Sequence, residues 1–186
     1  AVIFTLNGKV IAEAEDLITS YYPQQGWVEQ NPDEIERSAV KAINMAIKQA
    51  NVNKDEIISL GISAAMHSLI CIGDKGEPLS QALIWADGRS TKQANELMKS
   101  DGIEIFSKTG MPIHPMSPLA KLIWMKENDF SPYNQASYFL SIKEYLLLKW
   151  FDQRVIDYAM ASATGMFNGK TFKWDEEVLK KAGITE

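Results

Sequence analysis

Apolar residues near the start of the chain follow first a strand-like spacing and then a helix-like spacing. Two short apolar runs, residues 2–6 and 9–14, meet at Asn7-Gly8. Because this dipeptide favours a type I′ turn, the pattern predicts a β-hairpin. Between residues 35 and 47 apolar residues recur every three or four positions, which is typical of an amphipathic helix. Residues 31–34, Asn-Pro-Asp-Glu, supply its N-cap, a proline at the first helical position and a capping-box glutamate.

Strand and helix patterns continue to alternate through the rest of the chain. Apolar runs of strand length occur at 57–62, within 66–72 and within 82–90, the last two on either side of a glycine-bearing turn at 73–78. Such alternation is typical of one α/β domain, for which 186 residues suffice. Further helices are predicted from residue 90, over 119–126, from Ser141 to Trp150 with a capping box at Ser141 and Glu144, and from Asp175 to Gly183, and further strands over 138–140, 155–157, 164–167 and 170–174.

Composition and charge narrow the classes of partner. Hydrophobic residues make up 46% of the chain and charged residues 23%, as is ordinary for a globular protein. The net charge of −5 argues against nucleic acid as a partner, because phosphate backbones bind clustered Lys and Arg. No apolar run approaches the about 20 residues of a membrane helix, so no membrane partner is expected. One cysteine, Cys71, and no signal-peptide profile favour a cytoplasmic location.

Several common catalytic motifs are absent from the sequence. Two histidines and one cysteine are too few for a tetrahedral zinc site, and no Gly-x-Ser-x-Gly elbow is present for a serine hydrolase. Residues 165–171, Gly-Met-Phe-Asn-Gly-Lys-Thr, resemble a phosphate-binding loop but are one residue short between the glycines. A turn between two strands explains Asn168-Gly169 better, since a phosphate loop must lead into a helix.

A histidine at the end of a predicted strand is the first candidate for small-molecule binding. His67 follows strand 57–62 after a stretch of small residues and lies beside Met66. Polar and aromatic groups at strand ends commonly form small-molecule sites in α/β proteins. An imidazole can donate to and accept from adjacent hydroxyls, which suits a polyol. The alternative is a hydrogen-bonded structural histidine, and the position at a strand end favours binding.

A tryptophan, an aspartate and an arginine at alternating positions form the second candidate group. In an extended strand Trp85, Asp87 and Arg89 face one way. An indole packs well on the C–H face of a sugar, while a carboxylate and a guanidinium can bind vicinal hydroxyls or each other. The sequence leaves open whether Asp87 and Arg89 bind a ligand or form a structural pair. Lys121 and Trp124 could face the same pocket. Taken alone, however, these two residue types in a helix are typical of core packing and of an exposed helix surface.

In their order and spacing, these motifs resemble the FGGY family of carbohydrate kinases over nearly the whole chain. Met-His-Ser at 66–68 and Trp-Ala-Asp-x-Arg-Ser at 85–90 look most like gluconate kinases, whereas xylulokinases carry Met-His-Gly and Trp-Asn-Asp-x-Arg in the corresponding places. No single motif is decisive, but the ordered set is highly specific. The other motifs are Asn-Gly-Lys-Val at 7–10, Gly-Trp-Val-Glu-Gln-Asn-Pro at 26–32, Pro-Leu-Ala-Lys-Leu-Ile-Trp at 118–124, Lys-Glu-Tyr-Leu at 143–146 and residues 157–162.

The resemblance implies a fold and an activity. The fold is an α/β, ribonuclease-H-like (actin-like ATPase) domain with a mixed sheet and flanking helices, of which residues 1–186 are a partial N-terminal, sugar-binding part. The activity is ATP-dependent phosphorylation of a primary hydroxyl on an open-chain sugar or sugar acid, with gluconate as the leading substrate. A carboxylate substrate favours a nearby cation from Arg89, Lys121 or His114. The expected substrate-binding residues are Met66, His67, Trp85, Asp87 and Arg89, with His114 and Lys121 as further candidates.

Other parts of the family pattern fall outside residues 1–186. The family opens with an Asp-x-Gly-Thr turn that contacts phosphate and metal, and this chain begins after it, inside a strand and without Met, so we expect a trimmed chain. The catalytic aspartate and the C-terminal ATP-binding domain follow beyond Glu186. Phosphoryl transfer needs positioned phosphates, a metal and an oriented nucleophile. The resemblance therefore implies ATP and Mg²⁺ for the full-length enzyme, and no catalytic, cofactor-binding or metal residue and no activity for this part alone.

Three alternatives accompany the gluconate kinase hypothesis. A xylulokinase differs only in substrate, a non-catalytic sugar-sensing module keeps the fold without turnover, and a structural α/β domain has no site at all. In the first two cases the partner is still a small sugar or sugar acid. A second copy of the chain, forming a homodimer, is a further option that the sequence leaves open.

Overall fold

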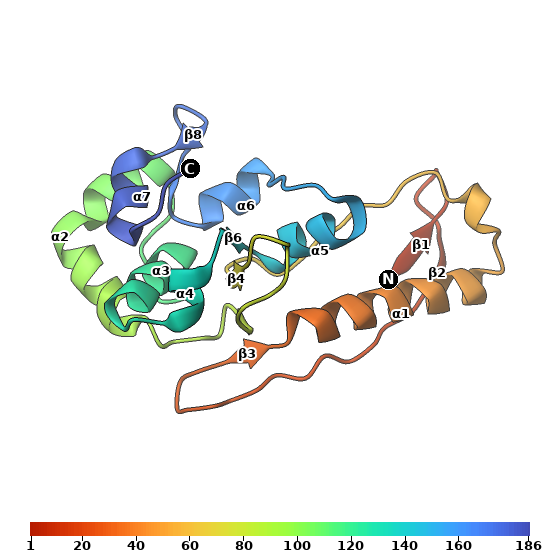
Figure 1. The fold of residues 1–186 in the computed structure, drawn as a ribbon. Helices are drawn as coiled ribbons and strands as arrows, with labels where there is room; N and C mark the ends of the chain where they lie inside the picture. Colours follow the sequence, from red (N-terminus) through yellow and green to blue (C-terminus); the bar gives the residue numbers. More distant parts are fainter.

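Seven α-helices and eight short strands make up the computed structural model, which describes residues 1–186 (Figure 1). No helix combines the length and the apolar character that crossing a membrane requires. The helices are α1 (Pro32–Ala50), α2 (Thr91–Thr109), α3 (Pro118–Glu127), α4 (Ser131–Gln135), α5 (Ile142–Phe151), α6 (Tyr158–Ala163) and α7 (Glu176–Ala182), with a 3₁₀ turn η1 at Lys54–Glu56. The strands are β1 (Val2–Phe4), β2 (Val10–Glu13), β3 (Glu29–Gln30), β4 (Ile70–Ile72), β5 (Ala82–Leu83), β6 (Tyr138–Leu140), β7 (Phe167–Asn168) and β8 (Lys173–Trp174).

Helix ends follow the capping signals of the sequence. The Asn31 side chain accepts a hydrogen bond of 3.0 Å from the Glu34 amide at the start of α1, as predicted. Ser141 and Glu144 form the predicted capping box at the start of α5. The predicted helices correspond to α1, α2, α3, α5 and α7, whereas α4 and α6 lie in regions for which no helix was predicted.

The predicted hairpin is present, but its turn differs from the predicted type. β1 and β2 pair antiparallel, with Phe4 opposite Val10. A type I′ turn needs a positive φ at both central residues, and Gly8, with φ of 83°, is the only residue of the connection that has one. The connection is a wider loop, closed by a hydrogen bond of 2.9 Å from the Gly8 amide to the Thr5 carbonyl. The type I′ prediction was therefore wrong.

All strand pairs in the structure are antiparallel and two-stranded, namely β1–β2, β3–β5, β4–β6 and β7–β8. The mixed sheet implied by the resemblance is not formed within these residues. Residues 57–62 have the apolar pattern of a strand but pair with no neighbour, and Ile58 and Leu60 are 74% and 55% exposed. Residues 155–157 also lie outside any strand. Both strand predictions were wrong because a strand requires a partner for its backbone groups as well as an apolar pattern.

The core lies on both sides of β4, whose three residues are fully buried. Cys71 belongs to a cluster that includes Leu83 of β5 and residues of α2, α3 and α7. These three helices lie at one end of the molecule (Figure 1). Ile70 and Ile72 belong to a second cluster that includes residues of α1 and α5. This alternation is expected for a strand covered on both faces. The residues just before β4 and just after β5 are consequently held by a well-packed centre.

Candidate functional site

The two predicted binding segments meet at one edge of the β4–β5 region. Leu69 and Leu83 exchange backbone hydrogen bonds of 3.0 and 2.9 Å in an antiparallel bridge. His67 lies two residues before this bridge and Trp85 two residues after it. Because the segments run in opposite directions, both residues emerge on the same side of the bridge. The structure thus places together the two segments that the sequence analysis singled out.

His67 has an unusual backbone and a defined ring orientation. Its φ is +70°, in the left-handed region that residues with a Cβ seldom adopt. The ring Nδ1 lies 3.1 Å from the carbonyl oxygen of Ala163, at the end of α6. A carbonyl can only accept, so Nδ1 carries the proton and Nε2 is free to accept a hydrogen bond. Burial lowers the pKa of His67 and outweighs the bond to Ala163, and the charges of Lys121 and His114 lower it further.

Asp87 and Arg89 bind each other in the protein interior. The Arg89 Nε and Nη2 atoms each lie 2.8 Å from a carboxylate oxygen of Asp87, and both side chains are buried. The Val28 amide also donates to Asp87, over 2.7 Å. Of the two alternatives that the sequence left open, this geometry favours the structural pair. Buried charges require such partners, because desolvation of an unpaired charge is costly.

Two further side chains complete the surroundings of Arg89, and their roles were missed from the sequence. Glu29 accepts a hydrogen bond of 2.6 Å from Arg89 Nη2. The Trp27 ring lies under the guanidinium, with 3.9 Å between the Arg89 Cζ and the ring centroid, and Trp124 packs edge-on against Trp27. Both Trp27 and Glu29 belong to the Gly-Trp-Val-Glu-Gln motif. Their membership of this motif was the one signal in the sequence that could have indicated these roles.

Lys121 projects from α3 beneath this edge and is completely buried. Its Nζ donates to three backbone carbonyl oxygens, at 2.6 Å from His67, 3.0 Å from Leu83 and 2.8 Å from Ile84. Burial lowers the pKa of the Lys121 ammonium, and the charge of Asp87 opposes this shift. An ammonium has three N–H donors, so Lys121 has none left for a ligand.

The accessible members of the predicted site are Met66, Trp85 and His114, with His67 half-buried. Met66 and Trp85 are 46% and 57% exposed. His114 is exposed on the loop before α3. This loop is tied to the Trp85 segment by a hydrogen bond of 2.8 Å from the Ser90 hydroxyl to the Pro115 carbonyl. An exposed indole beside an imidazole acceptor can pack on a sugar and bind one of its hydroxyls.

Two motifs of the sequence have purely structural roles. Asp157 caps α6 by accepting a hydrogen bond of 3.0 Å from the Met160 amide, and Lys143 donates to it over 2.6 Å. The loop-like motif at 165–171 lies in the antiparallel pair β7–β8 and does not open a helix. The prediction of a strand turn there is therefore confirmed. No group of three or more His, Cys, Asp or Glu side chains is arranged to hold a metal ion.

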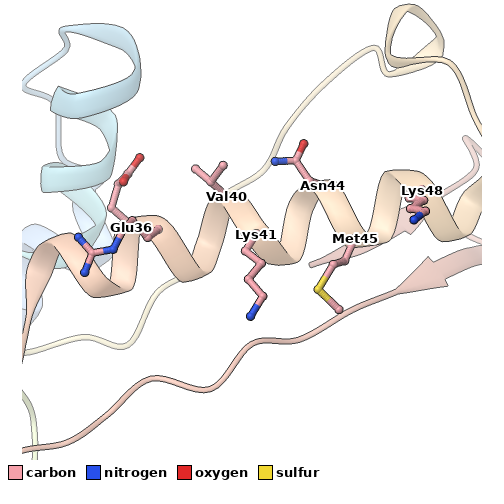
Figure 2. Close-up of a pocket in the computed structure, with 7 residues that line it drawn as sticks. Glu36, Val40, Lys41, Asn44, Met45 and Lys48 are labelled. Carbon is pink, nitrogen blue, oxygen red and sulfur yellow. The ribbon is translucent and has the colours of Figure 1, made fainter.

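One surface groove lies away from these residues. It has a volume of about 520 Å³ and follows α1, where Figure 2 shows Val40, Asn44 and Met45 along the helix. Lys41 in the same groove pairs with Asp16 over 2.7 Å. None of the residues predicted to bind substrate lines this groove, and its open, mostly charged wall lacks the apolar enclosure typical of small-molecule sites.

Residues 1–186 match the N-terminal domain of the FGGY family of carbohydrate kinases over their whole length, so the chain belongs to this family of phosphotransferases. It is 39% identical to the gluconokinase of Bacillus subtilis (strain 168), covering 100% of this chain and 36% of that protein. It is 30% identical to the glycerol kinase of Thermococcus gammatolerans, covering 100% of this chain and 38% of that protein. The chain thus spans little more than a third of the length of the curated relatives that it matches.

Solved structures of the same family superpose closely on the chain. The crystal structure of gluconate kinase from Lactobacillus acidophilus has a TM-score of 0.93 and 31% identity, covering 99% of this chain and 37% of that one. Ligand-bound xylulose kinase from the same organism has the same TM-score of 0.93 and 31% identity, covering 100% of this chain and 37% of that one. The backbone arrangement described above is therefore that of the family's N-terminal domain. These two structural likenesses do not distinguish one sugar from another.

Proposed function

We propose that this chain is the sugar-binding part of an ATP-dependent kinase that phosphorylates a primary hydroxyl of an open-chain sugar or sugar acid. The observation that carries the proposal is the neutral His67, whose Nε2 acceptor lies on the same edge as the exposed Trp85. An uncharged acceptor suits a hydroxyl donor, and an indole face suits the C–H groups of a sugar. Membership of a carbohydrate kinase family supports the same conclusion.

Gluconate is the substrate that we favour. Two gluconokinases from Bacillus species are 39% identical over the whole chain, whereas the glycerol kinases compared are 28–32% identical. Of the three cations considered for a carboxylate, Arg89 and Lys121 are buried and bonded within the protein, and His114 is exposed. The carboxylate of gluconate would therefore meet His114 or cations elsewhere in the parent protein. Xylulose is the alternative, since a xylulose kinase matches the backbone equally well.

ATP and Mg²⁺ are assigned to the parent protein outside residues 1–186. The general base and the nucleotide domain likewise belong outside this part. The chain's own contribution is to bind the sugar, orient the reacting hydroxyl and exclude water from it. A cytoplasmic location and a homodimer are both compatible with this role.

The experiment that tests this proposal is a substrate panel with the full-length protein. ATP consumption is measured with gluconate, xylulose, ribulose and glycerol at equal concentrations. We expect gluconate to give the highest kcat/KM. A higher value for xylulose would replace the favoured substrate and leave the kinase class intact. Inactivity on all four, in protein whose circular dichroism shows it to be folded, would favour the sugar-sensing module instead.

A further inference from the structure

We propose that Lys121 is a positioning residue that holds the His67 turn against the strand end leading to Trp85. The inference rests on the proposed function, since His67 and Trp85 are its sugar-contacting residues. Lys121 does not touch the sugar, because all its N–H donors bind backbone carbonyls and its side chain is buried. It acts by fixing where the His67 ring lies relative to the indole.

The three acceptors of Lys121 do not depend on it equally. The Leu83 carbonyl also accepts from the Leu69 amide over 3.0 Å, and the Ile84 carbonyl also accepts from the Asp87 amide over 3.0 Å. The His67 carbonyl has no hydrogen-bond donor other than Lys121, at 2.6 Å. Loss of the ammonium therefore leaves one carbonyl unpaired, and that carbonyl belongs to the proposed sugar-binding residue.

The backbone of His67 adds a reason why such support is needed. Its φ of +70° is costly for a residue with a Cβ, and such conformations persist only where the surroundings hold them. Two contacts hold His67, namely the Lys121 bond to its carbonyl and the bond between its Nδ1 and the Ala163 carbonyl. Without the first, we expect the turn to relax and the ring to lose its single orientation.

Lys121 also fixes the distance between the two binding segments. One ammonium binds the carbonyl of His67 and the carbonyl of Ile84, the residue directly before Trp85. α3 itself is fixed in the core through Leu122 and Met125, which are fully buried. The side chain is thus a rigid bridge from the core to both segments. Small displacements of binding groups reduce catalytic efficiency, so this bridge affects substrate binding without contacting substrate.

The test compares two variants of the full-length protein. Lys121→Met removes the ammonium and keeps the length of the side chain, and Val178→Ala, on α7, perturbs the same core cluster from a different helix without removing an anchor of α3. We expect Lys121→Met to raise the KM for the sugar roughly threefold to tenfold, as for loss of one hydrogen bond to the substrate, with the KM for ATP unchanged. Val178→Ala should lower the melting temperature but leave both KM values unchanged.

A second readout does not require activity. Diethyl pyrocarbonate acylates neutral imidazoles, and mass spectrometry gives the ratio of modification at His67 to that at exposed His114. We expect Lys121→Met to raise this ratio severalfold and Val178→Ala to leave it unchanged. If the wild-type protein phosphorylates no sugar, the proposed function fails while this ratio still decides the role of Lys121. An unchanged sugar KM and an unchanged ratio in a folded Lys121→Met variant, or in Lys121→Gln if the first does not fold, would overturn the inference.

Discussion

The guanidinium of Arg89 binds both carboxylate oxygens of Asp87 at 2.8 Å, two residues away along the chain. Both residues were expected to face a sugar, and instead they form a buried pair stacked on Trp27. The accessible residues at this edge are Met66, Trp85 and His114, with His67 half-buried. The buried pair therefore supports the segment from which Trp85 projects.

Arg89→Ala should destabilise the fold rather than specifically weaken sugar binding. It leaves the buried carboxylate of Asp87 without its partner, which typically costs about 3–5 kcal/mol in free energy of unfolding. Urea denaturation of the full-length protein measures this loss. Lys92→Ala is the control, because Lys92 and Glu96 are exposed and 3.9 Å apart and should contribute less than about 0.5 kcal/mol. A folded Arg89→Ala variant of wild-type stability but with raised sugar KM would assign Arg89 to the ligand.

Sugar binding should weaken in acid because His67 must be neutral to accept a hydroxyl. Burial holds the pKa of His67 below its ordinary value of 6.5, so the ring is unprotonated at pH 7. In this pH region the folded state binds fewer protons than the unfolded state. His67 therefore also lowers the free energy of unfolding as pH falls below 6.5. The KM for the sugar should rise as pH falls through the lowered pKa. His67→Gln, which keeps an acceptor that does not titrate there, should flatten that rise, and an identical pH profile would exclude His67 as its source.

Protonation of Glu144 should change the stability of the fold in the opposite direction from protonation of His67. Burial raises the pKa of this carboxyl above its ordinary value of 4.5, and its Oε1 has no hydrogen-bond partner. The stabilisation by its protonated form is complete below pH 4.5 and is lost as pH rises through the raised pKa. Glu144→Gln keeps the capping acceptor without the charge, so its stability relative to the wild type should increase between pH 4.5 and pH 7.

Unfolding measurements at several pH values check this prediction, with Glu56→Gln as control. Glu56 also closes a capping box, at η1, but it is exposed, so water solvates its charge. A stability difference for Glu144→Gln that does not change with pH would contradict the account of Glu144.

Cys71 should report the opening of the core. Burial raises the pKa of this thiol to about 11, and only a thiolate reacts readily with iodoacetamide. Alkylation of the Cys71 peptide, followed by mass spectrometry, should be slow in native protein and fast in concentrated urea. Variants that destabilise the core, such as Leu122→Ala, should accelerate it by about tenfold for each 1.4 kcal/mol of lost stability. Rapid alkylation of native wild-type protein would show that β4 is not protected.

Local signals account for what could be predicted from the sequence. Asn31, Ser141 and Asp175 each begin a helix as their capping chemistry indicates, because a cap involves residues only a few positions apart. The same reasoning would have found α6, since Asp157 caps it. Residues 57–62 were mistaken for a strand because pairing depends on a neighbour that local pattern does not reveal.

The sequence singled out two segments that the structure brings together, but it did not indicate which of their side chains are buried and which are accessible. Lys121 lies among residues of a helix and has an ordinary charged side chain, so nothing local indicates that it is buried. Its three acceptors are 37 to 54 positions away in the chain. Arg89 similarly owes its burial to Glu29 and Trp27, which come from a segment 60 or more residues earlier. Such roles depend on tertiary contacts.

The central claim, that this edge binds the sugar of a kinase, is tested most directly by His67→Ala in the full-length protein. The measurement is kcat/KM for gluconate, with kcat/KM for ATP and the melting temperature determined on the same samples. We predict that the gluconate value falls roughly threefold to tenfold, since a neutral hydrogen bond contributes about 0.5–1.5 kcal/mol, while the melting temperature changes little. An unchanged kcat/KM for gluconate in folded protein would show that His67 is structural and would contradict the account.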